Sequence, residues 1–198
     1  MARADEQRPR RDWGEAAALL VGLALSIGLQ DRYIFGGVAL NLSLGALLAI
    51  MCALSIFWTI VGNRKKTRTI TMIASGVFAI NVLASTIQVV LMIVKPEGSI
   101  DGVRLIETAL FIWVSNVTVF AIIYSLIERE FAFTGPEGST EPITFLDCIY
   151  LSFTTSTAFS ATDAPPLTTR ARMLTILEAT ISLMTISVVA ARAVNILK

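Results

Sequence analysis

The chain of 198 residues has no histidine and only two cysteines, Cys52 and Cys148. The lack of an imidazole excludes histidine-ligated metal sites, catalytic triads that use a histidine base, and histidine pH switches. Both cysteines lie inside apolar stretches, which favours small packed side chains over a disulfide or a metal site. The sequence therefore predicts no enzyme activity, no metal site and no cofactor.

Charge is scarce as well. Charged residues make up 16% of the chain and the formal net charge is +1, so no electrostatic argument favours a nucleic-acid partner. Hydrophobic residues make up 55% and the mean hydropathy is +0.71. This composition is too apolar for a soluble domain and predicts an integral protein of the lipid bilayer. The charged arm before Trp13 leads to no small-residue cleavage site, so we expect no cleavable signal.

Apolar segments divide the chain into candidate membrane helices. A spanning helix needs about 20 mainly apolar residues, and the segments that meet or approach this length are 13–29, 36–61, 69–94, 105–127 and 169–197. A basic segment, a turn-rich loop and a polar turret separate them. A short amphipathic helix is predicted before the last span, over residues 143–156. The expected fold is an all-α membrane protein with about five transmembrane helices and a re-entrant helix before the last one.

The chain is expected to contain two functional regions. Residues 1–104 form a three-helix membrane region, and residues 105–198 form a pore unit. In the pore unit, the helix over 143–156 is too short to span the bilayer, and its carboxyl end carries unpaired carbonyls that favour a nearby cation. Hydroxyl side chains cluster at that end, from Thr154 to Thr157. The following residues, 158–162, are the candidate constriction, while an ordinary polar loop is the alternative interpretation.

A resemblance to a known family supports the pore interpretation. The run Phe153-Thr-Thr-Ser-Thr-Ala-Phe-Ser-Ala-Thr-Asp163 resembles the pore region of bacterial two-helix-pore ion channels, relatives of potassium channels. Their typical run is aromatic, small, Thr, x, Thr, Thr, Val, Gly, Tyr, Gly, Asp. The resemblance covers about residues 105–198 and continues through Pro166 into the last helix. It implies a homotetramer that passes permeant ions across the plasma (inner) membrane of a bacterium.

The filter itself departs from the family. Ser160 and Thr162 stand where the family has glycines, and glycine supplies the positive φ that a carbonyl-lined filter needs. We therefore expect a wider constriction lined by hydroxyls, or none that conducts. Phe159 either packs outward behind the filter or plugs the axis. The predicted ion-pathway residues are Thr155, Thr157, Ala158, Phe159, Ser160, Ala161, Thr162 and Asp163.

The predicted inner helix contains two candidate functional residues, Glu178 and Ser182. Glu178 is an ionisable residue inside a membrane span, which usually faces protein or water and has a partner. It is interpreted as a brace behind the filter, with pairing to Arg170 or Arg172 at the interface as the alternative. Ser182 stands where the family has its hinge glycine, so helix bending there is in doubt. Asp147, near the first turn of the short helix, is expected to cap it.

Orientation in the membrane stays open. The arm before Trp13 and the basic segment 63–68 both favour the cytoplasm, and counting spans then places the filter mouth there too, whereas the family resemblance places it outside. The leading hypothesis for function is an oligomeric, weakly selective ion channel. The alternative is a non-conducting membrane assembly or sensor protein that keeps a channel-like fold. A membrane enzyme is the third possibility and would need a carboxylate or hydroxyl site that no pattern reveals.

Overall fold

A computed structural model of the chain describes residues 13–30, 38–94, 102–133, 143–157 and 164–196. Within these ranges the protein is helical, with six α-helices, one short 3₁₀ helix and no β-strand. The helices are α1 (Trp13–Gln30), α2 (Val38–Val61), α3 (Arg64–Val94), α4 (Gly102–Leu126), η1 (Glu128–Glu130), α5 (Phe145–Ser156) and α6 (Thr169–Ile196). This architecture confirms the all-α prediction for the described part of the chain.

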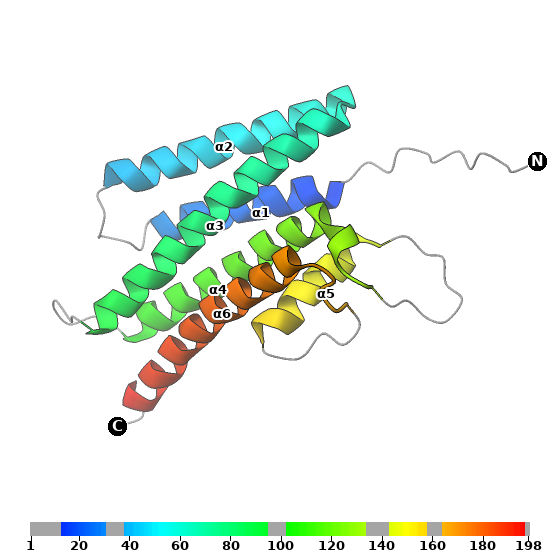
Figure 1. The fold of residues 1–198 in the computed structure, drawn as a ribbon. Coiled ribbons are helices and arrows are strands. Elements are labelled where there is room, and N and C mark those ends of the chain that lie inside the picture. The colour runs from blue at the N-terminus through cyan, green and yellow to red at the C-terminus, as the bar shows by residue number, and fades with distance from the viewer. Residues whose placement is uncertain (1–12, 31–37, 95–101, 134–142, 158–163, 197–198) are drawn as a thin grey trace, which may run out of the picture.

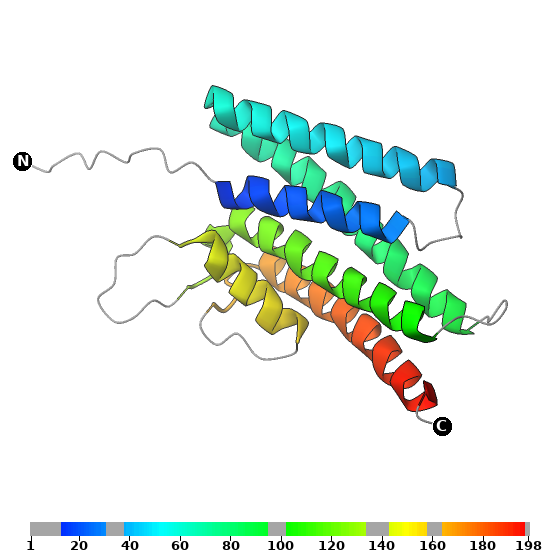
Figure 2. The same ribbon diagram turned by 180° about the vertical axis from the view of Figure 1, so that it is seen from behind.

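The helices α4 and α3 hold the bundle together. α4 packs against α1, α3, α5 and α6, while α2 packs on the far side against α1 and α3. Figures 1 and 2 show α2 as an outer helix and α5 beside the carboxyl half of α4. One hydrophobic core runs through both halves, joining Leu48 and Phe78 to Ile112 and Ile181. The core is thus continuous across residue 104, where the sequence predicts a boundary between two regions.

Three described helices are long and apolar enough to cross a membrane. They cover Lys65–Leu91, Val103–Leu126 and Thr169–Ala191, and a shorter apolar helix covers Ala46–Val61. Three such helices in one chain are the pattern of an integral membrane protein. A fourth and a fifth span, which the sequence predicts over residues 13–29 and 36–61, stay predictions.

The basic segment 63–68, which the sequence predicts to separate two spans, belongs to α3 from Arg64 onward. Only Gly62 and Asn63 connect α2 to α3, and Gly62 adopts a φ of +79°, which glycine accepts without strain. The Lys66 amide donates a hydrogen bond to the Asn63 side-chain oxygen at 3.3 Å. Asn63 thereby caps α3, which begins at Arg64, so the basic residues form its first turns.

Close packing of α1 on α3 depends on one glycine. A Cβ atom added to Gly22 of α1 would lie 2.5 Å from Cε1 of Phe78, a distance that real contacts do not show. The Phe78 ring is buried in the core and has little room to retreat. Gly22 therefore sets how near the two helices approach.

Candidate functional site

The predicted short helix is present and begins with the predicted cap. α5 covers Phe145–Ser156. Asp147 accepts hydrogen bonds from the Thr144 amide at 2.6 Å and from the Thr144 hydroxyl at 2.8 Å. The Asp147 amide pairs in return with the Thr144 side chain, which completes a capping box. A capping box satisfies amide groups that the first helical turn leaves free. The expected capping role of Asp147 is confirmed.

Glu178 is the centre of a buried polar cluster. Its side chain has no exposed surface. The Tyr124 hydroxyl of α4 donates to its Oε2 at 2.5 Å, and the Ser152 hydroxyl of α5 donates to its Oε1. The Ser152 Oγ also lies 2.9 Å from the Val117 carbonyl oxygen of α4. Glu178 of α6 therefore joins three helices, and the partner that the sequence requires for a carboxyl group inside a span is present.

The alternative position for Glu178, at a solvated interface, is wrong. Arg170 pairs with Glu130 instead, with 3.5 Å between Nη1 and Oε1. The carboxyl group is buried between α4, α5 and α6 with hydroxyl partners. That it braces the filter stays a prediction, because residues 158–163 lie outside the described residues.

A second link joins α4 to α6 about two turns from Tyr124. The Asn116 side-chain amide donates to Ser182 Oγ at 2.8 Å and to the Glu178 carbonyl oxygen at 3.3 Å. Both side chains are fully buried. Ser182, at the predicted hinge position, is thus bonded to a neighbouring helix. The five residues Tyr124, Ser152, Glu178, Asn116 and Ser182 are called the α4–α5–α6 network below.

The hydroxyl groups at the end of α5 bond mainly to their own helix. Thr154 donates to the Tyr150 carbonyl at 2.8 Å, and Thr157 donates to the Phe153 carbonyl at 2.8 Å. These bonds satisfy backbone carbonyls of α5 itself. Thr155 and Thr157 are half-buried. The other predicted ion-pathway residues, Ala158, Phe159, Ser160, Ala161, Thr162 and Asp163, lie outside the described residues.

A short strap ties the end of α4 to the segment before α6. Phe131 forms an isolated β-bridge with Pro166. The Leu167 amide donates to the Glu130 carbonyl at 2.8 Å, and the Thr168 hydroxyl donates to Glu130 Oε2 at 2.6 Å. The strap fixes the beginning of α6 beside the end of α4. It therefore anchors one side of the segment that follows α5.

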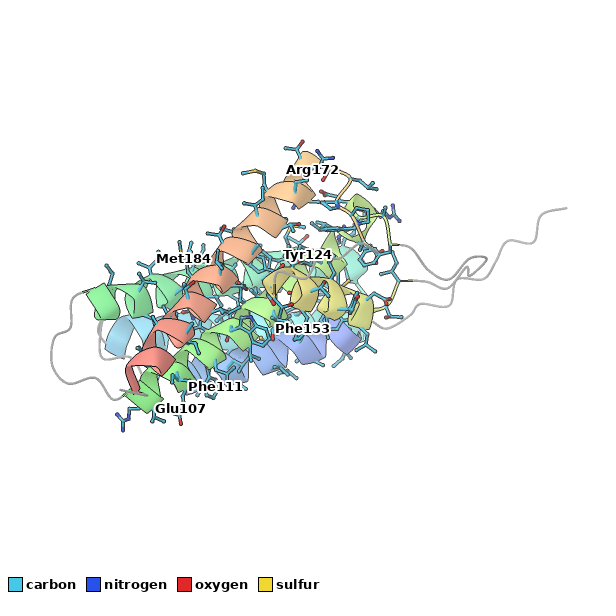
Figure 3. All side chains as sticks on the ribbon, turned by 90° about the horizontal axis from the view of Figure 1, so that it is seen from below. Glu107, Phe111, Tyr124, Phe153, Arg172 and Met184 are labelled. Atoms are coloured by element: carbon cyan, nitrogen blue, oxygen red, sulfur yellow. The ribbon has the colours of Figure 1, made fainter. Side chains whose placement is uncertain are left out.

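The basic start of α3 lies at the same end of the molecule as this strap. Arg68 donates to the Leu126 carbonyl oxygen at 2.6 Å. Figure 1 shows the α2–α3 turn, the end of α4 and the start of α5 on one side, and Figure 3 shows Arg172 and Glu107 at opposite ends. The positive-inside rule favours the cytoplasm for this end of the molecule, whereas the family resemblance implies the outside. The orientation in the membrane therefore stays open.

Sequence reasoning misses three members of the network, Tyr124, Asn116 and Ser152. Asn116 carries a usable signal, because it is a polar side chain in the middle of an apolar segment. Within the described residues no group of three or more histidine, cysteine or acidic side chains is placed to hold a metal ion. No protein-family model, curated protein or solved structure matches this chain.

Proposed function

We propose that this chain is a subunit of a homo-oligomeric ion channel, in which the end of α5 and the segment after it form the constriction. The observation that carries this proposal is a short helix held between two candidate spans by a buried polar network. α5 has 12 residues. A helix of this length extends about 18 Å, against a hydrocarbon core of about 30 Å. In the proposed arrangement α5 enters the bilayer and ends at membrane depth.

The carboxyl end of α5 needs polar surroundings. Its last carbonyl groups have no partners within the helix, and non-helical backbone at membrane depth is tolerated only inside protein or beside water. The same carbonyls place a partial negative charge that favours a cation. A water-filled axis shared by several subunits meets both needs. Thr155 lies on the last turn of α5 and Thr157 directly follows the helix, so both would border that axis.

The single chain leaves much of α5 and α6 uncovered, so their surfaces are available for assembly. Only 28% of the apolar window of α6 is buried, compared with 56% for α4. Large side chains stand out from both helices, among them Leu146, Tyr150, Phe153, Met173, Ile176 and Leu183. Neighbouring copies would cover this surface and the end of α5 together. The resemblance to potassium-channel relatives makes a tetramer in a bacterial plasma membrane, with five spans in each chain, the proposed arrangement.

The constriction is expected to select weakly between potassium and sodium. Ser160 and Thr162 occupy the positions of the filter glycines. A β-branched residue such as Thr162 resists the positive φ that alternating filter carbonyls require. A wider opening lined by side-chain hydroxyls discriminates less between ions of one charge than a ring of fixed carbonyls.

A non-conducting assembly or sensor protein is the second candidate. The observation that favours it is Ser182, which replaces the hinge glycine of the resembled family and is bonded to Asn116. This bond holds α6 against α4 and opposes bending of the inner helix. A protein that keeps a channel-like fold without opening would carry such a link.

Planar bilayers containing the purified full chain test the proposal. We expect conductance and a small reversal potential when potassium faces sodium. Replacing Phe159 by Ala should raise the conductance if its ring plugs the axis, or weaken assembly if its ring packs outward. The matched control is Phe57→Ala, which removes an exposed ring from α2 and should change neither property.

Two results would count against the channel, and a third would count against its expected weak selectivity. A silent bilayer over a wide range of voltage, pH and salt would favour the non-conducting candidate. A monomeric particle in both mild detergent and nanodiscs would exclude the shared axis. A current that strongly prefers potassium would contradict the argument from the missing glycines and would leave the oligomer intact.

A further inference from the structure

A shallow cavity lies on the first turns of α3, close to the α2–α3 turn and away from the α4–α5–α6 network. It has a volume of about 220 Å³ and is lined by Lys65, Lys66, Thr69 and Ile70. Two cationic side chains, one hydroxyl and one apolar side chain therefore share one open surface.

The two lysines have charge available for a ligand. Both are exposed, and within the described residues neither forms an ion pair. The Lys66 ammonium sits over the Trp58 ring, 4.0 Å from its centroid, a contact that positions the cation without neutralising it. The guanidinium of Arg68 is differently placed, because it donates to the Leu126 carbonyl.

The cavity also lies at one end of two apolar helices. Lys65 begins one candidate span, and the shorter apolar helix ends at Val61, so in a bilayer this end would lie near the lipid headgroups. Trp58 is an aromatic residue of the kind that collects at this level. Close to this end, Ile60 and Ile73 are more than half exposed, and they offer apolar surface to an acyl chain.

We propose that Lys65 and Lys66 bind the phosphate group of an anionic phospholipid, with its acyl chains against the apolar surface below. Charge complementarity selects an anion, and the apolar flank selects a lipid over free phosphate. A zwitterionic lipid offers the same phosphate beside a compensating amine and binds more weakly. This site lies outside the region proposed to conduct ions, and its existence does not depend on conduction.

Lipid titration of the full chain tests the site. Purified protein in uncharged detergent is titrated with dioleoylphosphatidylglycerol, with dioleoylphosphatidylcholine and with inorganic phosphate, and bound lipid is counted by native mass spectrometry. The double variant Lys65→Gln/Lys66→Gln should bind phosphatidylglycerol roughly tenfold to thirtyfold more weakly. The double variant Lys65→Arg/Lys66→Arg keeps the charge and should retain binding. Unchanged helical circular dichroism shows that each variant folds.

The matched control removes the same charge elsewhere. Arg104 and Arg129 are exposed, and the double variant Arg104→Gln/Arg129→Gln should leave lipid affinity unchanged. If the arginine variant lost as much lipid affinity as the lysine variant, the binding would be a general attraction between positive charge and anionic lipid. That result would overturn the proposed site. Equal binding of the anionic and zwitterionic lipids would also overturn it. Displacement of the lipid by inorganic phosphate at equal concentration would show a free-anion site and contradict the lipid assignment.

Discussion

The front helices α1–α3 and the rear helices α4–α6 are held together by different interactions. The front helices meet through apolar packing and a few weak polar contacts, such as the Ser55–Thr71 hydroxyl pair at 3.0 Å. The rear helices share the α4–α5–α6 network, in which one carboxyl group serves two other helices. Because lipid tails are as apolar as leucine, apolar contact alone gives little preference for one arrangement in a membrane. The rear arrangement is therefore the more strictly specified of the two.

The front helices obtain their specificity from shape instead. The absence of a side chain at Gly22 admits the Phe78 ring, so α1 and α3 can meet at this point. A network of hydrogen bonds fixes both distance and angle, whereas a glycine contact fixes mainly distance. This difference suits a rear unit that must place the end of α5 accurately for the proposed channel.

The largest effect is expected from Glu178→Leu. Leucine leaves the Tyr124 hydroxyl without its acceptor in a dry core, and we expect a loss of about 3 kcal/mol in unfolding free energy. Glu178→Gln retains one acceptor oxygen and should cost about 1 kcal/mol. Reversible unfolding in mixed micelles measures both values. Thr180→Val, on the exposed side of the same helix, is the control, and equal stability of the Leu and Gln variants would break the comparison.

A smaller effect is expected from Gly22→Ala. The added methyl group overlaps the buried Phe78 ring, and overpacking of this kind costs about 1–3 kcal/mol. Gly76 of α3 has open space around it and is the matched control, since Gly76→Ala should be neutral or stabilise by up to about 1 kcal/mol. Thermal unfolding of the two variants side by side gives the answer. If both glycines tolerate alanine equally, steric fit does not specify the front helices.

Paired hydroxyl deletions compare the two regions directly. Tyr124→Phe removes a donor to a buried carboxyl group and should cost about 1–2 kcal/mol. Thr71→Val removes half of a neutral hydroxyl pair and should cost about 0.6 kcal/mol, the average for such bonds in a bilayer. The same micelle unfolding experiment serves for both. A larger loss at Thr71 would reverse the comparison between front and rear helices.

The smallest effect is expected from Arg170→Gln. The Arg170 side chain is 59% exposed and its ion pair with Glu130 spans 3.5 Å, and exposed ion pairs contribute about 0–1 kcal/mol. The hydrogen bonds of the strap remain in this variant. A shift in melting temperature as large as that of Tyr124→Phe would show that the strap contributes as much as the network to the stability of the rear helices.

Most of the helical fold is predictable from the sequence. Apolar run length locates α1, α2, α4, α5 and α6 to within three residues at each end, because a membrane helix must satisfy its backbone internally along its whole apolar length. The start of α3 is the exception. Its basic composition is typical of a loop outside the membrane. A helix can nevertheless continue out of the hydrocarbon, because Lys and Arg side chains reach the lipid headgroups.

The candidate site is predictable only in part. Glu178 is identifiable because an acidic residue inside a span is costly without a partner. Its partners Tyr124 and Ser152 depend on which faces of α4 and α5 turn toward α6, and apolar periodicity is weak where a helix is apolar all round. The filter-like segment rests on the family resemblance, and its residues 158–163 lie outside those that the structure describes.

Cysteine modification during current recording tests the central claim, that the end of α5 borders an ion path. Thr157→Cys places a thiol at this end, and Leu146→Cys places one on the exposed side of the first turn. The native Cys52 and Cys148 are buried, so a charged methanethiosulfonate reagent reports on the new thiols. We predict that the reagent blocks the current through Thr157→Cys and leaves that through Leu146→Cys unchanged. Block at Leu146→Cys alone, or the same response from both variants, would contradict the account.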